Sequence, residues 1–148
     1  MNKIIIAHFD GSCSNPKNGG DIGIGYHAEE LGKPQGSLFK VAKGGFVGTN
    51  NEAEYIALLH LLRRLSKQVP NTDVIVRGDS QIVVEQMNGD KRTNNHSLSE
   101  LQKQVKSLEK YFTNIRYEHV PREKNSLADN LSKKSIKHTL RDYYNYKF

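Results

Sequence analysis

The sequence is poor in cysteine and contains no long hydrophobic run. Its 148 residues include one cysteine, Cys13, which can form no disulfide within the chain and cannot by itself supply a thiolate zinc site. No apolar segment approaches the roughly 20 residues needed to span a membrane, and the apolar run at residues 4–7 is too short for a signal peptide. We therefore expect a cytoplasmic protein with no membrane partner and no disulfide.

Positive charge exceeds negative charge, but the excess is unevenly distributed. Lysine and arginine number 22 against 16 acidic residues, which gives a formal net charge of +6. Most of this excess lies after residue 130, in Lys133, Lys134, Lys137, Arg141 and Lys147 against Asp142 alone. A basic balance fits a polyanionic partner such as nucleic acid, but it is equally typical of an ordinary soluble surface. Charge alone leaves both alternatives open.

The length indicates one compact domain, since domains average roughly 150 residues. We assign residues 1–137 to this domain and residues 138–148 to a basic, aromatic tail. The tail contains Tyr143, Tyr144, Tyr146 and Phe148. Such side chains could contact phosphates and stack on bases, or they could pack against the domain. Both alternatives remain open for the tail.

Short apolar runs rich in β-branched residues predict five strands. The first three are joined by glycine-rich turns and predict an antiparallel meander; they cover residues 4–9, 22–26 and 38–47. The other two, at residues 74–76 and 114–120, alternate with segments of helical periodicity at 51–65, 81–87, 98–111 and 126–137. Asn50 or Asn51 is expected to cap the first helix. This order predicts an α/β fold with a mixed five-stranded sheet and helices on both faces.

Four acidic residues, Asp10, Glu54, Asp79 and Asp129, stand at or near the ends of predicted elements. Each has an ordinary alternative. Asp10 could initiate a turn, and Asp79 could be a helix N-cap. Glu54 and Asp129 could be acids that the dipole favours in the first turn of a helix or that water solvates. The positions alone do not decide between these roles and a shared function.

Glu54 departs most clearly from the usual pattern of an amphipathic helix, in which acidic residues lie on the polar face. Three leucines of its predicted helix, the last of them Leu65, project within about 40° of Glu54, whereas Glu52 projects to the opposite side. An ionised carboxylate at the head of an apolar face is costly unless a cation compensates it. We therefore interpret Glu54 as functional and Glu52 as a first-turn acid that the helix dipole stabilises.

Divalent metal ions would draw such carboxylates together. Carboxylates at close range repel each other and take up protons unless cations neutralise them, and Mg²⁺ prefers oxygen ligands. Two ions about 4 Å apart can activate a water and stabilise the leaving oxygen in phosphodiester cleavage. Periodicity does not show whether the four acids converge in space.

Four short segments, in their order along the chain, resemble the motifs of type 1 ribonuclease H. They are DGS at residues 10–12, TNNEAE at 49–54, GDSQ at 78–81 and NSLADNL at 125–131. The resemblance covers about residues 1–137. It implies the ribonuclease H fold and an endonuclease that hydrolyses the RNA strand of RNA/DNA hybrids, leaving 5′-phosphate and 3′-hydroxyl ends. It also implies two Mg²⁺ ions, or Mn²⁺ in their place, held by Asp10, Glu54, Asp79 and Asp129.

The resemblance also implies which residues contact the hybrid. Matching positions are Asn15, Thr49, Asn50, Asn51 and Gln81. Short amide and hydroxyl side chains suit a wide, shallow minor groove that displays 2′-hydroxyls. His119 stands ten residues before Asp129, the spacing of a family histidine that assists proton movement and product release. A structural or solvated role for His119 remains open, and Glu123 is a lesser candidate for the assisting role.

The sequence departs from the best-known bacterial pattern of this family. It has no tryptophan, and a short connection with Lys91 and Arg92 stands where many bacterial members insert an extra helix and a basic handle. We expect no separate hybrid-binding domain of the kind that eukaryotic members have. It is most similar to the compact branch found in archaea and some bacteria, and a monomer is expected. A non-catalytic hybrid-binding module and a nuclease acting on DNA are the alternative functions.

Overall fold

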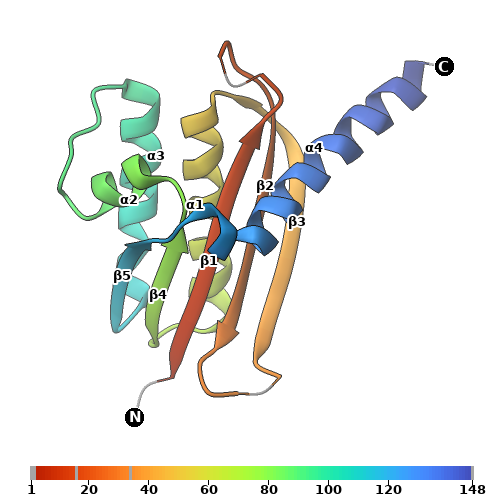
Figure 1. Ribbon diagram of the computed structural model, residues 1–148. Coiled ribbons are helices and arrows are strands. Elements are labelled where there is room, and N and C mark those ends of the chain that lie inside the picture. The colour runs from red at the N-terminus through yellow and green to blue at the C-terminus, as the bar shows by residue number, and fades with distance from the viewer. Residues whose placement is uncertain (1–2, 16, 34, 148) are drawn as a thin grey trace.

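Five strands form one mixed sheet in the order β3-β2-β1-β4-β5 (Figure 1). The computed structural model describes residues 3–15, 17–33 and 35–147, and for residues 137–147 it describes the helical backbone alone. The strands are β1 (Ile4–Cys13), β2 (Gly20–Glu30), β3 (Ser37–Gly48), β4 (Asp73–Gly78) and β5 (Asn114–His119). The β1–β2 and β2–β3 pairs are antiparallel, whereas β4 pairs in parallel with both β1 and β5. The predicted meander and mixed sheet are confirmed.

Helices cover both faces of this sheet, as the sequence predicts. They are α1 (Asn50–Gln68), α2 (Gln81–Met87), α3 (His96–Ser107) and α4 (Ser126–Lys147). Figure 1 shows α1 behind the sheet and α4 in front, where α4 crosses β1, β2 and β3. Short 3₁₀ turns at Glu109–Tyr111 and Arg122–Lys124 flank β5. None of the helices in the described ranges is long and apolar enough to cross a membrane.

The apolar face of α1 forms the main core with the central strand. Leu58, Leu61 and Leu65 are fully buried, as are Ile5 and Phe9 of β1. These two β1 side chains alternate with Ile6 and Asp10, which lie on the α4 side. The core therefore holds β1 against α1 and leaves the opposite face of β1 for α4 and for the carboxylate of Asp10.

Strand β1 is longer than the sequence predicts. It continues past Asp10 to Cys13, because β2 pairs with this whole stretch; Asp10 lies opposite Gly25, and Cys13 lies opposite Ile22. The expectation that Asp10 ends its strand is therefore wrong. Asp10 does not initiate a turn, because β2 pairs with the residues before and after it.

The N-cap of α1 also differs from the prediction. Thr49, rather than Asn50 or Asn51, caps the helix: its Oγ1 accepts a hydrogen bond from the Glu52 backbone N at 3.2 Å. The Glu52 carboxylate accepts in return from the Thr49 backbone N at 3.0 Å, which completes a capping box. The interpretation of Glu52 as a structural acid of the first turn fits this geometry.

The helices near the C-terminus have different ends from those predicted. The helical segment predicted at 98–111 divides into α3, which ends at Ser107, and the separate 3₁₀ turn at Glu109–Tyr111. Helix α4 continues to Lys147, so its expected end at Lys137 is wrong. The predicted tail is thus helical through Lys147. The aromatic and basic side chains assigned to it lie outside the described residues, and their role stays a prediction.

Candidate active site

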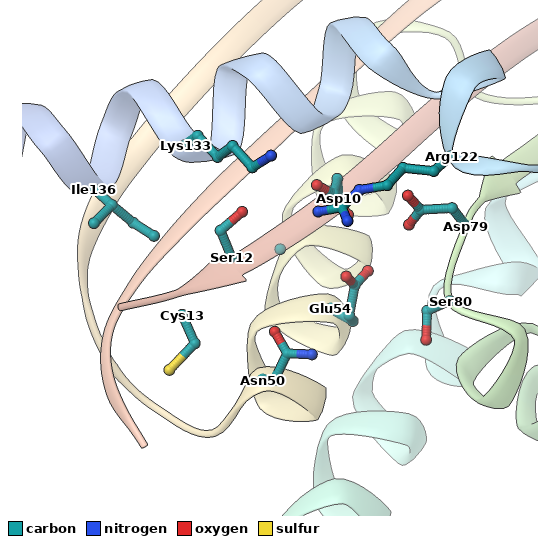
Figure 2. Close-up of a pocket in the computed structure, with 11 residues that line it drawn as sticks. Asp10, Ser12, Cys13, Asn50, Glu54, Asp79, Ser80, Arg122, Lys133 and Ile136 are labelled. Atoms are coloured by element: carbon teal, nitrogen blue, oxygen red, sulfur yellow. The ribbon is translucent and has the colours of Figure 1, made fainter. Parts of the chain in front are cut away.

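Three of the four predicted acids converge at one end of the sheet. Ligand oxygens of Asp10, Glu54 and Asp79 all lie within 4.8 Å of one another. Asp10 comes from β1, Glu54 from the first turns of α1, and Asp79 follows β4 directly. Figure 2 shows the three carboxylates pointing toward one another. They line a cleft with a volume of about 550 Å³.

The backbone explains why these carboxylates meet. His8 lies level with Arg77 in the parallel β1–β4 pair, and two residues further along the two strands come Asp10 and Asp79. Helix α1 can approach β1 closely because Gly11 has no side chain: a Cβ there would lie only 2.2 Å from the Ala53 carbonyl carbon. The glycine of the DGS motif therefore lets Glu54 reach Asp10.

Burial and the charges of neighbouring carboxylates make ionisation of Asp10 and Glu54 unfavourable. Asp10 is 4% exposed and Glu54 is 6% exposed. Burial, followed by the charge of Asp79, raises the pKa of Asp10 from its usual 3.8 to about 7. Burial and the neighbouring Asp10 raise the pKa of Glu54 well above its usual value. Oε2 of Glu54 is buried and has no hydrogen-bond partner among the described residues, so the site has an unmatched acceptor oxygen.

Asp129 lies beside this triad but, unlike its three members, forms ion pairs with basic side chains of the described residues. Its Oδ1 lies 3.6 Å from Nη2 of Arg122, and its Oδ2 accepts a hydrogen bond from Nζ of Lys133 at 3.0 Å. Partial burial alone would raise the pKa of Asp129, but hydrogen bonds to Lys133 and Asp10, together with the nearby cations, lower it. The structure therefore places the fourth predicted acid next to Asp10, with cationic partners.

Two ordinary alternatives for the acids fail. Asp79 is not a helix N-cap, because Oγ of Ser80 fills that role by accepting a hydrogen bond from the Val83 backbone N at 3.4 Å. Asp129 is not a freely solvated acid, because its side chain is only 13% exposed. Asp79 lines the cleft, and Asp129 contacts Arg122 and Lys133, two residues that line it.

The predicted hybrid-contacting residues lie in the loop after β1, at the start of α1 and at the start of α2. Asn50 lines the cleft, whereas the Thr49 hydroxyl is used by the capping box. Asn15 accepts a hydrogen bond from the Asn18 backbone N, and Gln81 donates to Glu85; both are exposed. Asn51 is half-buried in the first turn of α1. Their contacts with a hybrid stay predictions.

Arg122 and Lys133 line the cleft, although neither was predicted from the sequence as a site residue. His119 is exposed at the end of β5 and is not among the residues that line the cleft. Arg122, in the following 3₁₀ turn, does line it and extends toward Asp10 in Figure 2. Lys133 stands four residues after Asp129 on α4, and this helical spacing is the one sequence signal that could have revealed it.

Comparison with known proteins agrees with this geometry. Residues 8–135 match the family model described as "Reverse transcriptase-like". The chain is 32% identical to LC11-RNase H1, isolated from compost by a metagenomic approach, with a TM-score of 0.83 over 95% of this chain and 99% of that one. The chain belongs to the type 1 ribonuclease H family. This ribonuclease H chain is also similar to LC11-RNase H1 in its crystal structure in complex with RNA/DNA hybrid, with 30% identity and a TM-score of 0.81.

Archaeal and mycobacterial members of the ribonuclease H family are similar as well. RNase H1 from Halobacterium salinarum has 29% identity and a TM-score of 0.83 over 91% of this chain and 98% of that one. The N-terminal RNase H domain of Rv2228c from Mycobacterium tuberculosis has 29% identity and a TM-score of 0.87 over 95% and 99%. The chain spans 63% of the full halobacterial protein and 34% of the full mycobacterial one.

Proposed function

We propose that this ribonuclease H-family chain is an endonuclease that hydrolyses the RNA strand of RNA/DNA hybrids with two Mg²⁺ ions, leaving 5′-phosphate and 3′-hydroxyl ends. The observation that carries the proposal is the buried triad Asp10, Glu54 and Asp79, whose oxygens lie within 4.8 Å of one another. The family resemblance and the hybrid-bound structure of LC11-RNase H1 support the substrate class.

The residues present fit a divalent metal. Oε2 of Glu54 has no hydrogen-bond partner in the described part of the chain, and burial together with the neighbouring carboxylates raises the pKa values of Asp10 and Glu54. A bound cation would stabilise the ionised form of both carboxylates. Asp10, Glu54 and Asp79 would hold one ion, and Asp10 with Asp129 the other. When bound, Mg²⁺ activates water for attack and stabilises the leaving oxygen. Mn²⁺ could take its place, since it also accepts oxygen ligands.

Arg122 and Lys133 bring positive charge to the same cleft. Both contact Asp129, and the Arg122 side chain is 70% exposed, so it is free to turn from Asp129 toward a phosphate. A guanidinium recognises phosphate oxygens through paired hydrogen bonds. We therefore assign Arg122 to binding of the substrate backbone next to the scissile phosphate, and Lys133 to orienting the Asp129 carboxylate.

Strand type rather than base sequence would determine recognition. The hybrid-contacting positions near the cleft carry amide and hydroxyl groups, which suit the 2′-hydroxyls and base edges of a shallow minor groove. These positions are Asn15, Thr49, Asn50, Asn51 and Gln81. The described surface around them should thus accept hybrids of many sequences.

A substrate panel tests the proposal. Labelled RNA/DNA hybrid, double-stranded RNA, double-stranded DNA and single-stranded RNA are incubated with the protein and Mg²⁺, and product ends are mapped. We expect cleavage of the RNA strand of the hybrid with 5′-phosphate ends. Hybrid binding without cleavage would identify a binding module, and preferential cleavage of double-stranded DNA would identify a DNA nuclease; either result contradicts the proposal.

A further inference from the structure

Ser132 of α4 makes a buried hydrogen bond to the Asp10 carboxylate. Its side chain is fully buried, and its Oγ lies 3.1 Å from Oδ2 of Asp10. The same Oγ lies 2.6 Å from Oγ of Ser12 and 2.8 Å from the Asp129 carbonyl oxygen. Three oxygens therefore surround one serine hydroxyl beside the central acid of the site.

The protons of this cluster can be assigned by counting donors. Ser132 carries one hydroxyl proton, and both an ionised Asp10 and the Asp129 carbonyl can only accept. An ionised carboxylate is the stronger acceptor, so the Ser132 proton goes to Asp10. The 2.6 Å contact between the two hydroxyl oxygens is then a hydrogen bond that Ser12 donates to Ser132. The order of donation is Ser12 to Ser132 to Asp10.

The position of Ser132 is fixed by the packing of α4 on β2. A Cβ at Gly23 would lie 2.3 Å from the Ser132 carbonyl oxygen, and a Cβ at Gly25 would lie 2.6 Å from the Ser132 backbone N. The two glycines let the helix backbone rest directly on the strand. Because the interior is close-packed there, the Ser132 hydroxyl has a defined position relative to Asp10.

We propose that Ser12 and Ser132 form a hydrogen-bonded pair that positions the Asp10 carboxylate for divalent metal binding. Ser132 acts directly on Asp10, and Ser12 acts through Ser132, so both are positioning residues. The proposal rests on the metal-dependent function proposed above. Groups that orient metal ligands typically change metal affinity roughly 10-fold or more when removed.

Ser135 provides a matched control on the same helix. It is buried like Ser132, but its hydroxyl contacts the carbonyl oxygens of Ile24 and Ser132 rather than Asp10. Replacing Ser135 by alanine therefore removes a buried serine hydroxyl from the same interface. Thermal melting of each variant measures the loss of stability separately from the loss of metal affinity.

The experiment measures Mg²⁺ binding to the full chain by calorimetry without substrate. We expect Ser132→Ala to weaken binding roughly 10-fold and Ser135→Ala to leave it unchanged. Ser12→Ala should weaken binding by a smaller factor in the wild-type background and have no further effect in Ser132→Ala. Ser12→Thr, which keeps the hydroxyl at a half-exposed strand position, should bind as wild type.

When the variants fold, any of three results would overturn the inference. Unchanged Mg²⁺ affinity in Ser132→Ala is one, and an equal loss in Ser135→Ala is another. A further loss from Ser12→Ala in the Ser132→Ala background is the third, because it would show independent action. If Ser132→Ala fails to fold, the comparison of Ser12→Ala with Ser12→Thr decides, and equal affinities overturn the inference. Wild-type protein that binds Mg²⁺ but cleaves no hybrid contradicts the proposed function alone.

Discussion

The side-chain amide of Asn125 donates a hydrogen bond to the Phe9 carbonyl oxygen at 3.0 Å, between residues 116 positions apart in the sequence. Asn125 is 1% exposed and directly precedes α4, whereas Phe9 directly precedes Asp10. This bond fastens the start of α4 to the strand that carries the central carboxylate. It therefore links the stability of the α4 contact to the geometry of the site.

We expect Asn125→Ala to lower the free energy of unfolding by about 1–3 kcal/mol, because the buried Phe9 carbonyl would lose its side-chain donor. Urea denaturation measures this change. Asn114→Ala is the matched control, since Asn114 donates to Asp73 at the same 3.0 Å distance but at an exposed position. A loss in Asn114→Ala as large as that in Asn125→Ala would contradict the account.

Glu52→Ala should cost about 1 kcal/mol of stability, because one carboxylate serves two helix N-termini. It accepts from the Thr49 backbone N in α1 and from Oγ of Ser97, at 2.8 Å, in α3. Glu100→Ala is the comparison, since the Glu100–Lys103 ion pair is exposed and should contribute little. Equal chemical denaturation midpoints for Glu52→Ala and wild type would rule out this role.

Arg122→Ala should reduce kcat/KM on hybrid roughly 10-fold or more, as expected for loss of a charged hydrogen bond to phosphate. His119→Ala should have the smaller effect, because His119 is exposed and does not line the cleft. Arg116→Ala serves as the control for loss of positive charge, since Arg116 pairs with Glu118. Steady-state kinetics measures these values. A larger loss of kcat/KM in His119→Ala than in Arg122→Ala would contradict the assignment of Arg122 to phosphate binding.

Mg²⁺ affinity should rise as the pH increases from 6 to 8. Asp10 must be ionised to bind metal, and its pKa in the metal-free protein is raised to about 7. Below this value protons compete with the ion, so affinity should fall up to about 10-fold per pH unit for one competing proton. Calorimetry across this range measures the effect. A flat profile would show that Asp10 is already ionised without metal.

The same pKa shift makes metal-free stability depend on pH. Because the folded-state pKa of Asp10 lies above its usual 3.8, the folded state binds more protons, and stability falls as pH rises from about 4 through 7. Asp10→Asn removes this charge and should stabilise the metal-free protein at pH 8 by on the order of 1–4 kcal/mol. Denaturation in chelator at pH 5 and pH 8 checks the sign, and a destabilised Asp10→Asn at pH 8 would contradict it.

Much of the fold was predictable because local pattern and global architecture agree. The change from strand to helical periodicity after residue 50 predicted the order of elements, and the leucine stripe correctly placed Glu54 on the buried side of α1. The end of α4 was predicted wrongly because its basic, aromatic composition resembles a tail. No proline or glycine follows Ser126 to stop the helix.

The contacts that bring Ser132 and Arg122 to the site could not be predicted from the sequence. Ser132 and Arg122 reach the site only because α4 and the preceding 3₁₀ turn fold over β1, and no local pattern encodes that placement. The Thr49 cap was missed because three neighbouring polar residues all suit an N-cap. Thr49 is the cap because Glu52, three residues later, completes the capping box with it. The Glu52 carboxylate also accepts a hydrogen bond from Ser97 of α3.

The most direct test of the central claim is cleavage of labelled RNA/DNA hybrid by wild type and by Asp10→Asn, each with Mg²⁺ and with chelator. We expect that only wild type with Mg²⁺ cleaves the RNA strand, since Asp10 belongs to the buried triad and also contacts Asp129. Hybrid cleavage that survives chelation, or that persists at the wild-type rate in Asp10→Asn, would contradict metal-dependent catalysis at this site.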